Sequence, residues 1–182
     1  MAFTLGCMRA LMTARLVLAP WQDCFEEGLA RLAADERVVR YVGDGQPWSG
    51  EHARERHQAC LRHWEEHGFG WRAILDGPGG GFLGVAALSY LGALVPGIAE
   101  SAIEIGWWLD PGAWGRGMAS EAAAAIRDEA FGSVGGERIV ARIQPANHAS
   151  ARVAARLGMR LHGDVAGRLG EPVRVYVLDR PG

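Results

Sequence analysis

Apolar positions along the chain follow two spacings. Alternation, or a short apolar run bounded by turn residues, predicts strands, whereas repeats of three and four residues predict helices. Strands are expected at residues 13–19, 70–76, 82–90, 102–109, 138–143, 159–164 and 173–179. Helices are expected at residues 24–42, 50–67, 117–131 and 147–158. Because strands and helices are interleaved, the pattern predicts a mixed α/β fold built on one sheet.

Turn and capping residues mark the ends of several elements. Ser49 is placed to cap a helix that starts at Gly50, and Gly68 follows the last residue of that helix. The segment GPGGG, residues 77–81, lies between two strand patterns. A dinucleotide-binding loop would lead into a helix, so this segment is expected to be a hairpin turn.

The length of 182 residues fits one domain with a substantial core. We expect that domain at residues 12–182, with residues 1–11 as a loosely attached extension. Arg9 and Arg15 interrupt the apolar N-terminal segment. We therefore expect neither a signal peptide nor a membrane segment there.

Charge and cysteine content narrow the class further. The net charge of −2 argues against a surface that binds nucleic acid. Cys7, Cys24 and Cys60 are widely spaced and form no CxxC pair. We therefore expect no zinc ribbon and no disulfide framework, and a cytoplasmic location is the default for such a chain.

Residues 106–126, GWWLDPGAWGRGMASEAAAAI, run from a strand pattern through a glycine-rich turn into a helix that lacks the usual capping residue. A helix start offers free backbone N–H groups and the positive end of the helix dipole, which favour a bound anion. Gly115 and Gly117 let those amides approach a phosphate, and Arg116 adds a donor. The alternative is a turn whose free amides are satisfied by water or by Ser120.

A second polar block follows in RIQPANHASARVAARLGM, residues 142–159. Asn147 can cap the helix that starts there. Ser150 lies one turn later on the same helix face, so both side chains can address one ligand.

Together these two blocks resemble the GNAT superfamily of acyl-CoA N-acyltransferases, in particular its Rim-type branch, which acetylates ribosomal-protein N-termini and varied small amines. The family's phosphate loop reads Gln/Arg-x-x-Gly-x-Gly/Ala, and WGRGMA occupies it here with Trp114 at the first position. The family's later block, Asn-x-x-Ser followed by a basic residue and Gly-Phe, is similar to NHAS and RLGM, with Met159 for the Phe. TARLVLAP and EIGWWLDP match as well, so the resemblance covers roughly residues 12–180.

The resemblance implies the GNAT fold: a mixed, mostly antiparallel central sheet, splayed at the cofactor site, with helices on both faces. It implies acetyl-CoA as cosubstrate, with the amides of residues 115–120 on the pyrophosphate. The strand before the loop would pair with the pantetheine arm, and the Asn-x-x-Ser helix would face the pantetheine and the thiol. The implied cofactor-binding residues are Trp107, Trp108, Leu109, Trp114, Gly115, Arg116, Gly117, Met118, Ala119, Ser120, Asn147 and Ser150.

The implied reaction is a direct attack of a primary amine on the thioester in a ternary complex. A backbone N–H near Trp108 would bind the developing oxyanion. Many relatives carry an acidic Tyr where this chain has Ala154, so Ser150 is the candidate general acid, as in the Rim-type branch. The amine must lose a proton first, and Glu104 or a water chain would accept it, with Glu100 just upstream.

The acceptor is expected to be a small-molecule or peptide amine. Trp48, in the loop before the second helix, is the candidate acceptor-binding residue, and the loops around residues 21–50, 91–100 and 160–172 would set specificity. The Rim-type resemblance is compatible with a homodimer. The absent Tyr leaves a non-catalytic module that binds or senses coenzyme A as the alternative function.

One competing motif is HWEEH, residues 63–67, which matches the inverted zinc-protease signature His-x-x-Glu-His. It stands at the last helical turn before Gly68, and a rigid zinc site needs a third protein ligand. A polar helix end is the favoured interpretation, and no metal is expected.

Overall fold

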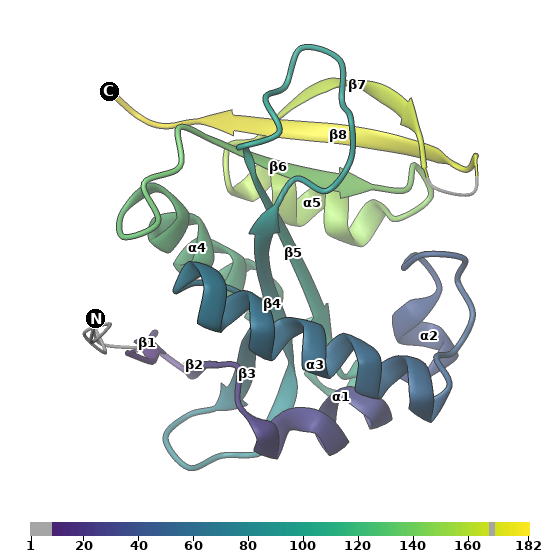
Figure 1. Cartoon of the computed structure of the whole chain (residues 1–182), viewed down its shortest axis with the longest axis vertical. Helices are drawn as coiled ribbons and strands as arrows, with labels where there is room; N and C mark the ends of the chain where they lie inside the picture. The colour runs from purple at the N-terminus through teal and green to yellow at the C-terminus, as the bar shows by residue number, and fades with distance from the viewer. Residues whose placement is uncertain (1–8, 168–169) are drawn as a thin grey trace.

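A single twisted sheet forms the centre of the molecule. The computed structural model describes residues 9–167 and 170–182. Within them the sheet has eight strands in the order β1-β2-β3-β4-β5-β6-β8-β7 (Figure 1). Neighbours are antiparallel except β5 and β6, which are parallel, so the expected mixed, mostly antiparallel sheet is confirmed. The strands are β1 (Leu11–Met12), β2 (Leu16–Pro20), β3 (Arg72–Asp76), β4 (Phe82–Tyr90), β5 (Ile103–Leu109), β6 (Arg138–Ile143), β7 (Arg160–Ala166) and β8 (Pro172–Asp179).

Helices cover both faces of the sheet, as expected. They are α1 (Glu26–Ala33), α2 (Glu36–Val39), α3 (Gly50–His67), α4 (Met118–Phe131) and α5 (His148–Arg156), with short 3-10 turns at Asp23–Phe25 and Pro111–Ala113. One apolar core joins α4 and α5 to strand residues such as Ile74 and Ile105. A second core joins α1 and α3 to strand residues such as Ala73 and Val85. Neighbouring strand residues point to opposite faces, which explains why Ala73 and Ile74 belong to different cores.

The sheet splays where its one parallel pair begins. β5 and β6 pair only through Ile103 with Ile139 and Glu104 with Val140. Beyond these pairs the last five residues of β5 continue beside β4 alone, down to Leu109. The free edge of β5 therefore faces a gap between the two halves of the sheet, confirming the expected splay (Figure 1).

The first third of the chain departs from the sequence pattern. The expected strand 13–19 begins only at Leu16, because residues 13–15 form a turn that follows the short strand β1. The expected helix 24–42 is broken into α1 and α2. Asp35 causes the break, since its carboxylate accepts the Arg37 N–H at 2.9 Å and caps a new helix start.

The sequence predicted a loosely attached extension at residues 1–11. Residues 1–8 of it lie outside the described residues, so only residues 9–11 can be compared with that prediction. The rest of that segment is attached to the domain. Leu11 pairs with Leu18 in β1–β2, and the backbone carbonyl of Arg9 accepts a hydrogen bond from Arg72 at 3.0 Å.

A buried ion pair joins the sheet to α4. Arg72 on β3 donates from Nε to Glu129 of α4 at 2.7 Å, and a second guanidinium nitrogen contacts the same carboxylate. Arg72 also donates to the carbonyl of Leu18 and lies over the Trp64 ring. Both charged side chains are nearly inaccessible to solvent. Each therefore depends on the other to compensate for the hydration that it loses on burial.

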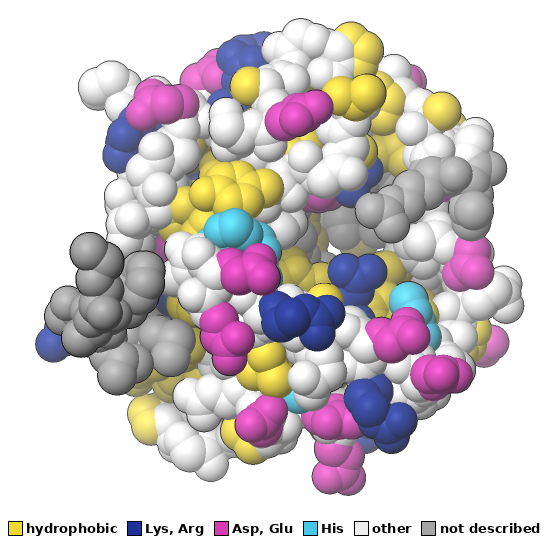
Figure 2. All heavy atoms as spheres, in the orientation of Figure 1, with side chains coloured by type: hydrophobic (Ala, Val, Ile, Leu, Met, Phe, Trp, Pro, Cys, Tyr) yellow, Lys and Arg dark blue, Asp and Glu magenta, His cyan; other side chains and the backbone are white. Residues whose placement is uncertain are grey.

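The helix α3 presents a face of mixed charge. Acidic and basic side chains are interspersed over the side of the molecule that α3 covers (Figure 2). Its ends match the sequence pattern: Ser49 Oγ accepts the His52 N–H at 3.1 Å, and Gly68 adopts a left-handed φ of 72°. Among the described residues, no helix combines the length and hydropathy that a membrane crossing needs.

Candidate active site

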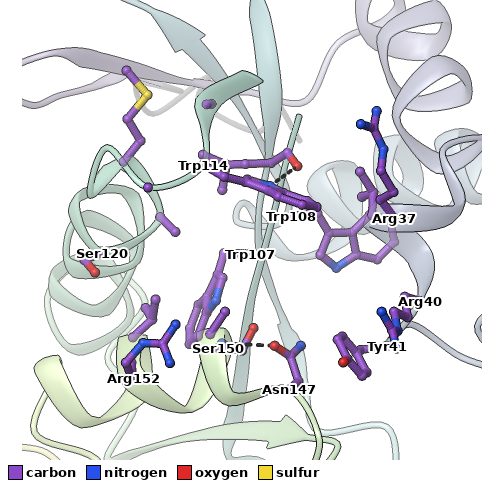
Figure 3. A pocket seen from close by; sticks show the side chains of 18 of the residues that line it. Arg37, Arg40, Tyr41, Trp107, Trp108, Trp114, Ser120, Asn147, Ser150 and Arg152 are labelled. Carbon is purple, nitrogen blue, oxygen red and sulfur yellow. Dashed lines mark hydrogen bonds between the residues drawn. The ribbon is translucent and has the colours of Figure 1, made fainter. Parts of the chain in front are cut away.

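A cleft of about 830 Å³ opens at the splay. One side is formed by residues 113–120 and α5, and the free edge of β5 crosses the middle (Figure 3). The other side is α2 with the turn that follows it, which we call the α2 wall (residues 36–42 and 45). The cleft brings together the two polar blocks identified in the sequence, which residues 127–141 separate along the chain.

The loop before α4 has the geometry of an anion site. Gly115 and Gly117 adopt left-handed φ angles of 73° and 77°, which explains why glycine occupies both positions. The helix α4 begins at Met118 without a side-chain cap. Among the described residues, no hydrogen bond outside the regular helices and strands starts at a backbone N–H of residues 115–120. Several unpaired amides at the positive end of a 14-residue helix therefore fit a phosphate group.

An ionic clamp holds this loop in place. Glu121, in the first turn of α4, accepts hydrogen bonds from Thr13 Oγ1 at 2.6 Å and from Arg15 N and Nε at 2.9 and 2.8 Å. Arg15 also donates to the carbonyl of Arg116 at 2.8 Å. Desolvation acts to raise the pKa of Glu121, but the bonds from Thr13 and Arg15 outweigh it and lower that pKa. The residues of this clamp are more than 100 positions apart, so the sequence pattern did not reveal it.

Most of the predicted cofactor-binding residues line the cleft. The lining set includes Trp107, Trp108, Leu109, Trp114, Gly115, Gly117, Met118, Ala119, Ser120, Asn147 and Ser150. Arg116 is the exception: its side chain is exposed and lies outside the lining set, and its carbonyl is engaged by Arg15.

Two hydrogen bonds, one at each end of β5, show which residues of this strand are bonded to β4. The Asp110 N–H donates to Leu83 O at 2.7 Å, and the Leu91 N–H donates to Ala102 O at 2.9 Å. Each bond joins two residues that face each other in the β4–β5 register. In an antiparallel pair, such bonded positions alternate with positions whose N–H and C=O groups point away from the partner strand.

This alternation decides which backbone groups face the gap. Trp108 faces Val85 at a bonded position, so its N–H and C=O are directed toward β4. Trp107 and Leu109 are at non-bonded positions, and their backbone groups are directed toward the open edge. The Trp108 N–H, which was expected to bind the oxyanion, is therefore directed toward β4, and the Trp107 N–H is the neighbouring one that faces the gap.

Trp114 occupies part of this open edge. Its indole N–H donates to the carbonyl of Leu109 at 2.8 Å, which is possible because that carbonyl points away from β4. Half of the Trp114 side chain remains exposed. Trp114 thus ties the loop to the strand that precedes it, leaving Trp107 as the cleft position with a free N–H and a free C=O within the described chain.

Asn147 and Ser150 lie on the helix α5 below the strand edge (Figure 3). The side-chain oxygen of Asn147 accepts the Ser150 N–H at 3.1 Å, so Asn147 caps α5 as the sequence allowed. The Ser150 hydroxyl lines the cleft and has no hydrogen bond to the described residues. It is available to a ligand.

Two arginines of α5 were absent from the predicted site. Arg152 and Arg156 line the cleft, and Arg156 donates to Ser120 Oγ at 3.2 Å beside the α4 start. Their spacing of four residues places both on one helix face. That spacing is the signal in the sequence that could have found them.

Glu104 and Trp48 do not line the cleft. The Glu104 carboxylate is held by Arg142 in a two-pronged ion pair, with distances of 2.8 and 3.0 Å. Trp48 stacks edge-on against Trp108 at 5.1 Å between ring centroids and belongs to the core under α1 and α3. Both residues therefore contact elements that form the cleft without reaching the cleft themselves.

The HWEEH segment forms a helix end. His63 and His67 lie 4.5 Å apart between ring centroids, and both rings contact the Phe69 ring. Desolvation, followed by repulsion from His67, lowers the pKa of His63. Within residues 9–167 and 170–182, no three His, Cys, Asp or Glu side chains form a group that could hold a metal ion.

Comparison with known proteins supplies the family. Residues 15–160 match the model of the acetyltransferase (GNAT) domain. An acetyltransferase structure from Agrobacterium tumefaciens is 31% identical, with a TM-score of 0.78 over 94% of this chain and 95% of that one. The N-acetyltransferase YnaD of Bacillus subtilis is 44% identical over 64 residues, which are 35% of this chain and 38% of YnaD. The matched segment thus spans well under half of that curated relative.

The fold is also that of RimL, a ribosomal L7/L12 alpha-N-protein acetyltransferase solved with coenzyme A. That structure is 20% identical, with a TM-score of 0.75 over 94% of this chain and 98% of that one. With the family model covering most of the chain, a splayed sheet and an uncapped glycine-rich helix start at the splay, this protein belongs to the GNAT acetyltransferase family.

Proposed function

We propose that this protein transfers the acetyl group of acetyl-CoA to a primary amine. The observation that carries the proposal is the row of unpaired amides at residues 115–120, which opens into the cleft beside the free edge of β5. Acetyl-CoA carries a pyrophosphate for the first feature and a pantetheine arm with two amides for the second.

In this proposal the acyl donor extends from the start of α4 along the free edge of β5. The pyrophosphate binds the amides at the start of α4, and Arg156 adds positive charge from α5. The pantetheine arm runs along β5 and donates an amide N–H to the free C=O of Trp107, which leaves the Trp107 N–H for the reacting carbonyl. Asn147 and Ser150 border the arm from the opposite side, which brings the thioester close to the Ser150 hydroxyl.

The chemistry then needs three groups around the thioester. The amine nitrogen attacks the carbonyl carbon, and the Trp107 N–H binds the oxyanion that forms. The C–S bond breaks, Ser150 donates a proton to the departing thiolate, and Ser150 regains a proton from the nitrogen, which loses one as the amide forms. We assign removal of the ammonium proton to water, because the carboxylate of Glu104 is engaged by Arg142 outside the cleft lining.

The proposal also includes membership of the Rim-type branch, with a protein N-terminus or a small amine as the acceptor. It further includes a homodimeric state and a cytoplasmic location. The shared fold with RimL supports a role in N-terminal acetylation. A non-catalytic coenzyme A module is the second candidate, because Ala154 takes the position where many GNAT enzymes carry an acidic Tyr.

Thermal unfolding with and without acetyl-CoA tests donor binding. A ligand at 100 times its Kd stabilises the native state by about 2.7 kcal/mol, so Tm should rise by several degrees at millimolar acetyl-CoA. An unchanged Tm would contradict the donor site. Release of free thiol over a panel of peptide N-termini, amino acids and polyamines tests turnover, and binding without thiol release would favour the second candidate.

The variant Ser150→Ala tests the proposed acid. We expect kcat to fall roughly 100-fold while KM for acetyl-CoA stays within about threefold, since general acid catalysis contributes 10²–10⁴-fold. Ser133→Ala, which removes an exposed hydroxyl far from the cleft, is the matched control. Near-normal kcat in Ser150→Ala would withdraw the acid assignment and leave the donor site intact.

A further inference from the structure

The α2 wall is the side of the cleft that no sequence motif identified. It is a hydrogen-bonded turn: Val39 is fully buried, the Val42 N–H donates to Val39 O at 2.7 Å, and the Gly45 N–H donates to Val42 O at 2.9 Å. Gly45 has a left-handed φ of 78° and packs against the backbone of Arg40. The side chains between these anchors are therefore held at the cleft mouth.

The charges along this wall are unequally satisfied. Arg37 forms a two-pronged ion pair with Asp35, at 2.9 Å from Nε and 2.5 Å from Nη2, and is neutralised. Glu36 contributes one exposed carboxylate. Arg40 is exposed, lines the cleft and has no carboxylate partner among the described residues. Arg40 is thus the cation of this wall that is free to bind an anion.

Tyr41 stands beside that cation. The guanidinium carbon of Arg40 lies 5.5 Å from the centre of the Tyr41 ring. The Tyr41 ring is half-buried, and its hydroxyl makes no hydrogen bond to the described residues. Figure 3 shows Arg40 and Tyr41 together on the wall that faces Asn147 across the cleft. A guanidinium and a phenol O–H, neither of them hydrogen-bonded to the described residues, form a donor pair that suits a carboxylate.

The arrangement of the cleft assigns this pair to the acceptor. The negative charge of the donor is met on the opposite side by the α4 amides and by Arg152 and Arg156. The amine has to approach the thioester from the side that the donor leaves open, and among the described residues that side is the α2 wall.

We infer that Arg40 and Tyr41 form a subsite for a carboxylate carried by the acceptor amine. This inference rests on the proposed function and names the substrate class within it. The shared chemistry is a primary amine with a nearby carboxylate. It is present in free amino acids and in peptides with an acidic residue next to the N-terminus.

Matched acceptor pairs test the inference. The first pair is glutamate and its α,γ-diamide, and the second is the peptide amide Ser-Asp-Ala-Ala and its Ser-Asn-Ala-Ala counterpart. Thiol release from acetyl-CoA gives kcat/KM for each amine. We expect the carboxylate member of at least one pair to be favoured roughly tenfold, which is the scale of one charge-assisted hydrogen-bond pair. The pair that shows the preference identifies the source of the carboxylate.

Variants place the preference on this wall. Arg40→Gln should abolish it without changing KM for acetyl-CoA, Tyr41→Phe should reduce it about threefold, and Arg40→Glu should reverse it. Arg31→Gln removes an exposed charge of α1 outside the cleft and should retain the preference. Equal kcat/KM within both acceptor pairs, or a preference that survives in Arg40→Gln, would overturn the inference.

The outcome is separable from failure of the proposed function. Turnover of the neutral amines without a carboxylate preference would overturn the subsite and retain the acetyltransferase. If no amine is turned over, the affinity of the same four amines is measured instead, by calorimetric titration into protein saturated with coenzyme A. Equal affinity within both pairs would then overturn the subsite as well.

Discussion

The two sides of the cleft offer different kinds of group to a ligand. The loop before α4 presents backbone N–H groups, held by two left-handed glycines and by the Glu121 clamp. The α2 wall presents side chains on a short turn. A backbone site tolerates changes of side chain as long as its conformation survives, whereas a side-chain site changes its ligand with a single substitution. This difference fits the proposed division of the cleft, with a constant acyl donor on one side and a variable amine on the other.

A pair of glycine substitutions should separate the two sides most strongly. Gly117 and Gly43 both have left-handed φ angles, of 77° and 57°, and a Cβ would meet no close backbone at either. Alanine in this conformation costs about 1–2 kcal/mol. We therefore expect Gly117→Ala to raise KM for acetyl-CoA roughly tenfold and to leave KM for the amine unchanged.

Gly43→Ala is the matched change beside the α2 wall. It should leave KM for acetyl-CoA unchanged and raise KM for the amine. Initial rates with one substrate varied at a time give both constants. If both variants affected the same constant, the division of the cleft into donor and acceptor sides would be wrong.

Acid should weaken the clamp of the donor side. The folded-state pKa of Glu121 lies below its ordinary value, so the stability it contributes is present above about pH 4.5 and is lost as the pH falls through the lowered value. Glu121→Gln should lower Tm at pH 7 by several degrees, since hydrogen bonds to a charged group contribute about 1.5–3 kcal/mol. The gap in Tm between wild type and variant should close as the pH is lowered from 5 to 3.

Asp35→Asn is the comparison for that experiment. The hydrogen bond from Arg37 lowers the pKa of Asp35 too, but this carboxylate lies just before the α2 wall and its partner Arg37 is largely exposed, so solvent screens the pair. Its gap in Tm should be small at every pH. A Glu121→Gln gap that stayed constant with pH would show that the clamp acts through shape and not through charge.

The smallest effect is expected from Glu104→Gln. Its ion pair with Arg142 lies behind the cleft, so kcat should change less than about threefold and the pH dependence of kcat should keep its acidic limb. Rates measured from pH 6 to 10 with saturating acetyl-CoA decide the matter. If the fall of kcat at low pH disappeared in this variant, Glu104 would be the base.

The sequence predicted the donor side because its signals are local. Gly115, Gly117 and the uncapped helix start stand within one short segment, and their geometry follows from backbone rules. The ends of α3 were predicted for the same reason, from Ser49 and Gly68. Which residues of β5 are bonded to β4 could not be predicted, because the bonds at Asp110 and Leu91 depend on the register of the two strands.

The region expected to set specificity at residues 21–50 includes the α2 wall, but the sequence did not identify which of its residues reach the cleft. Helical spacing continues through residues 24–42, but the carboxylate of Asp35 caps a second helix there and redirects the chain toward the cleft. Glu104 and Trp48 were placed near the site by sequence alone. Their side chains are turned away by an ion pair and by ring packing, which are contacts between distant segments.

The buried pair of Arg72 and Glu129 has a consequence for the history of this chain. Loss of either partner alone leaves an uncompensated charge in the core, at a cost of about 3–5 kcal/mol, a large part of the stability of a typical domain. Loss of both, with apolar residues of similar volume in their place, is often neutral. The two positions, 57 residues apart, are therefore expected to vary together among relatives or not at all, and a double substitution is the accessible route from one core to another.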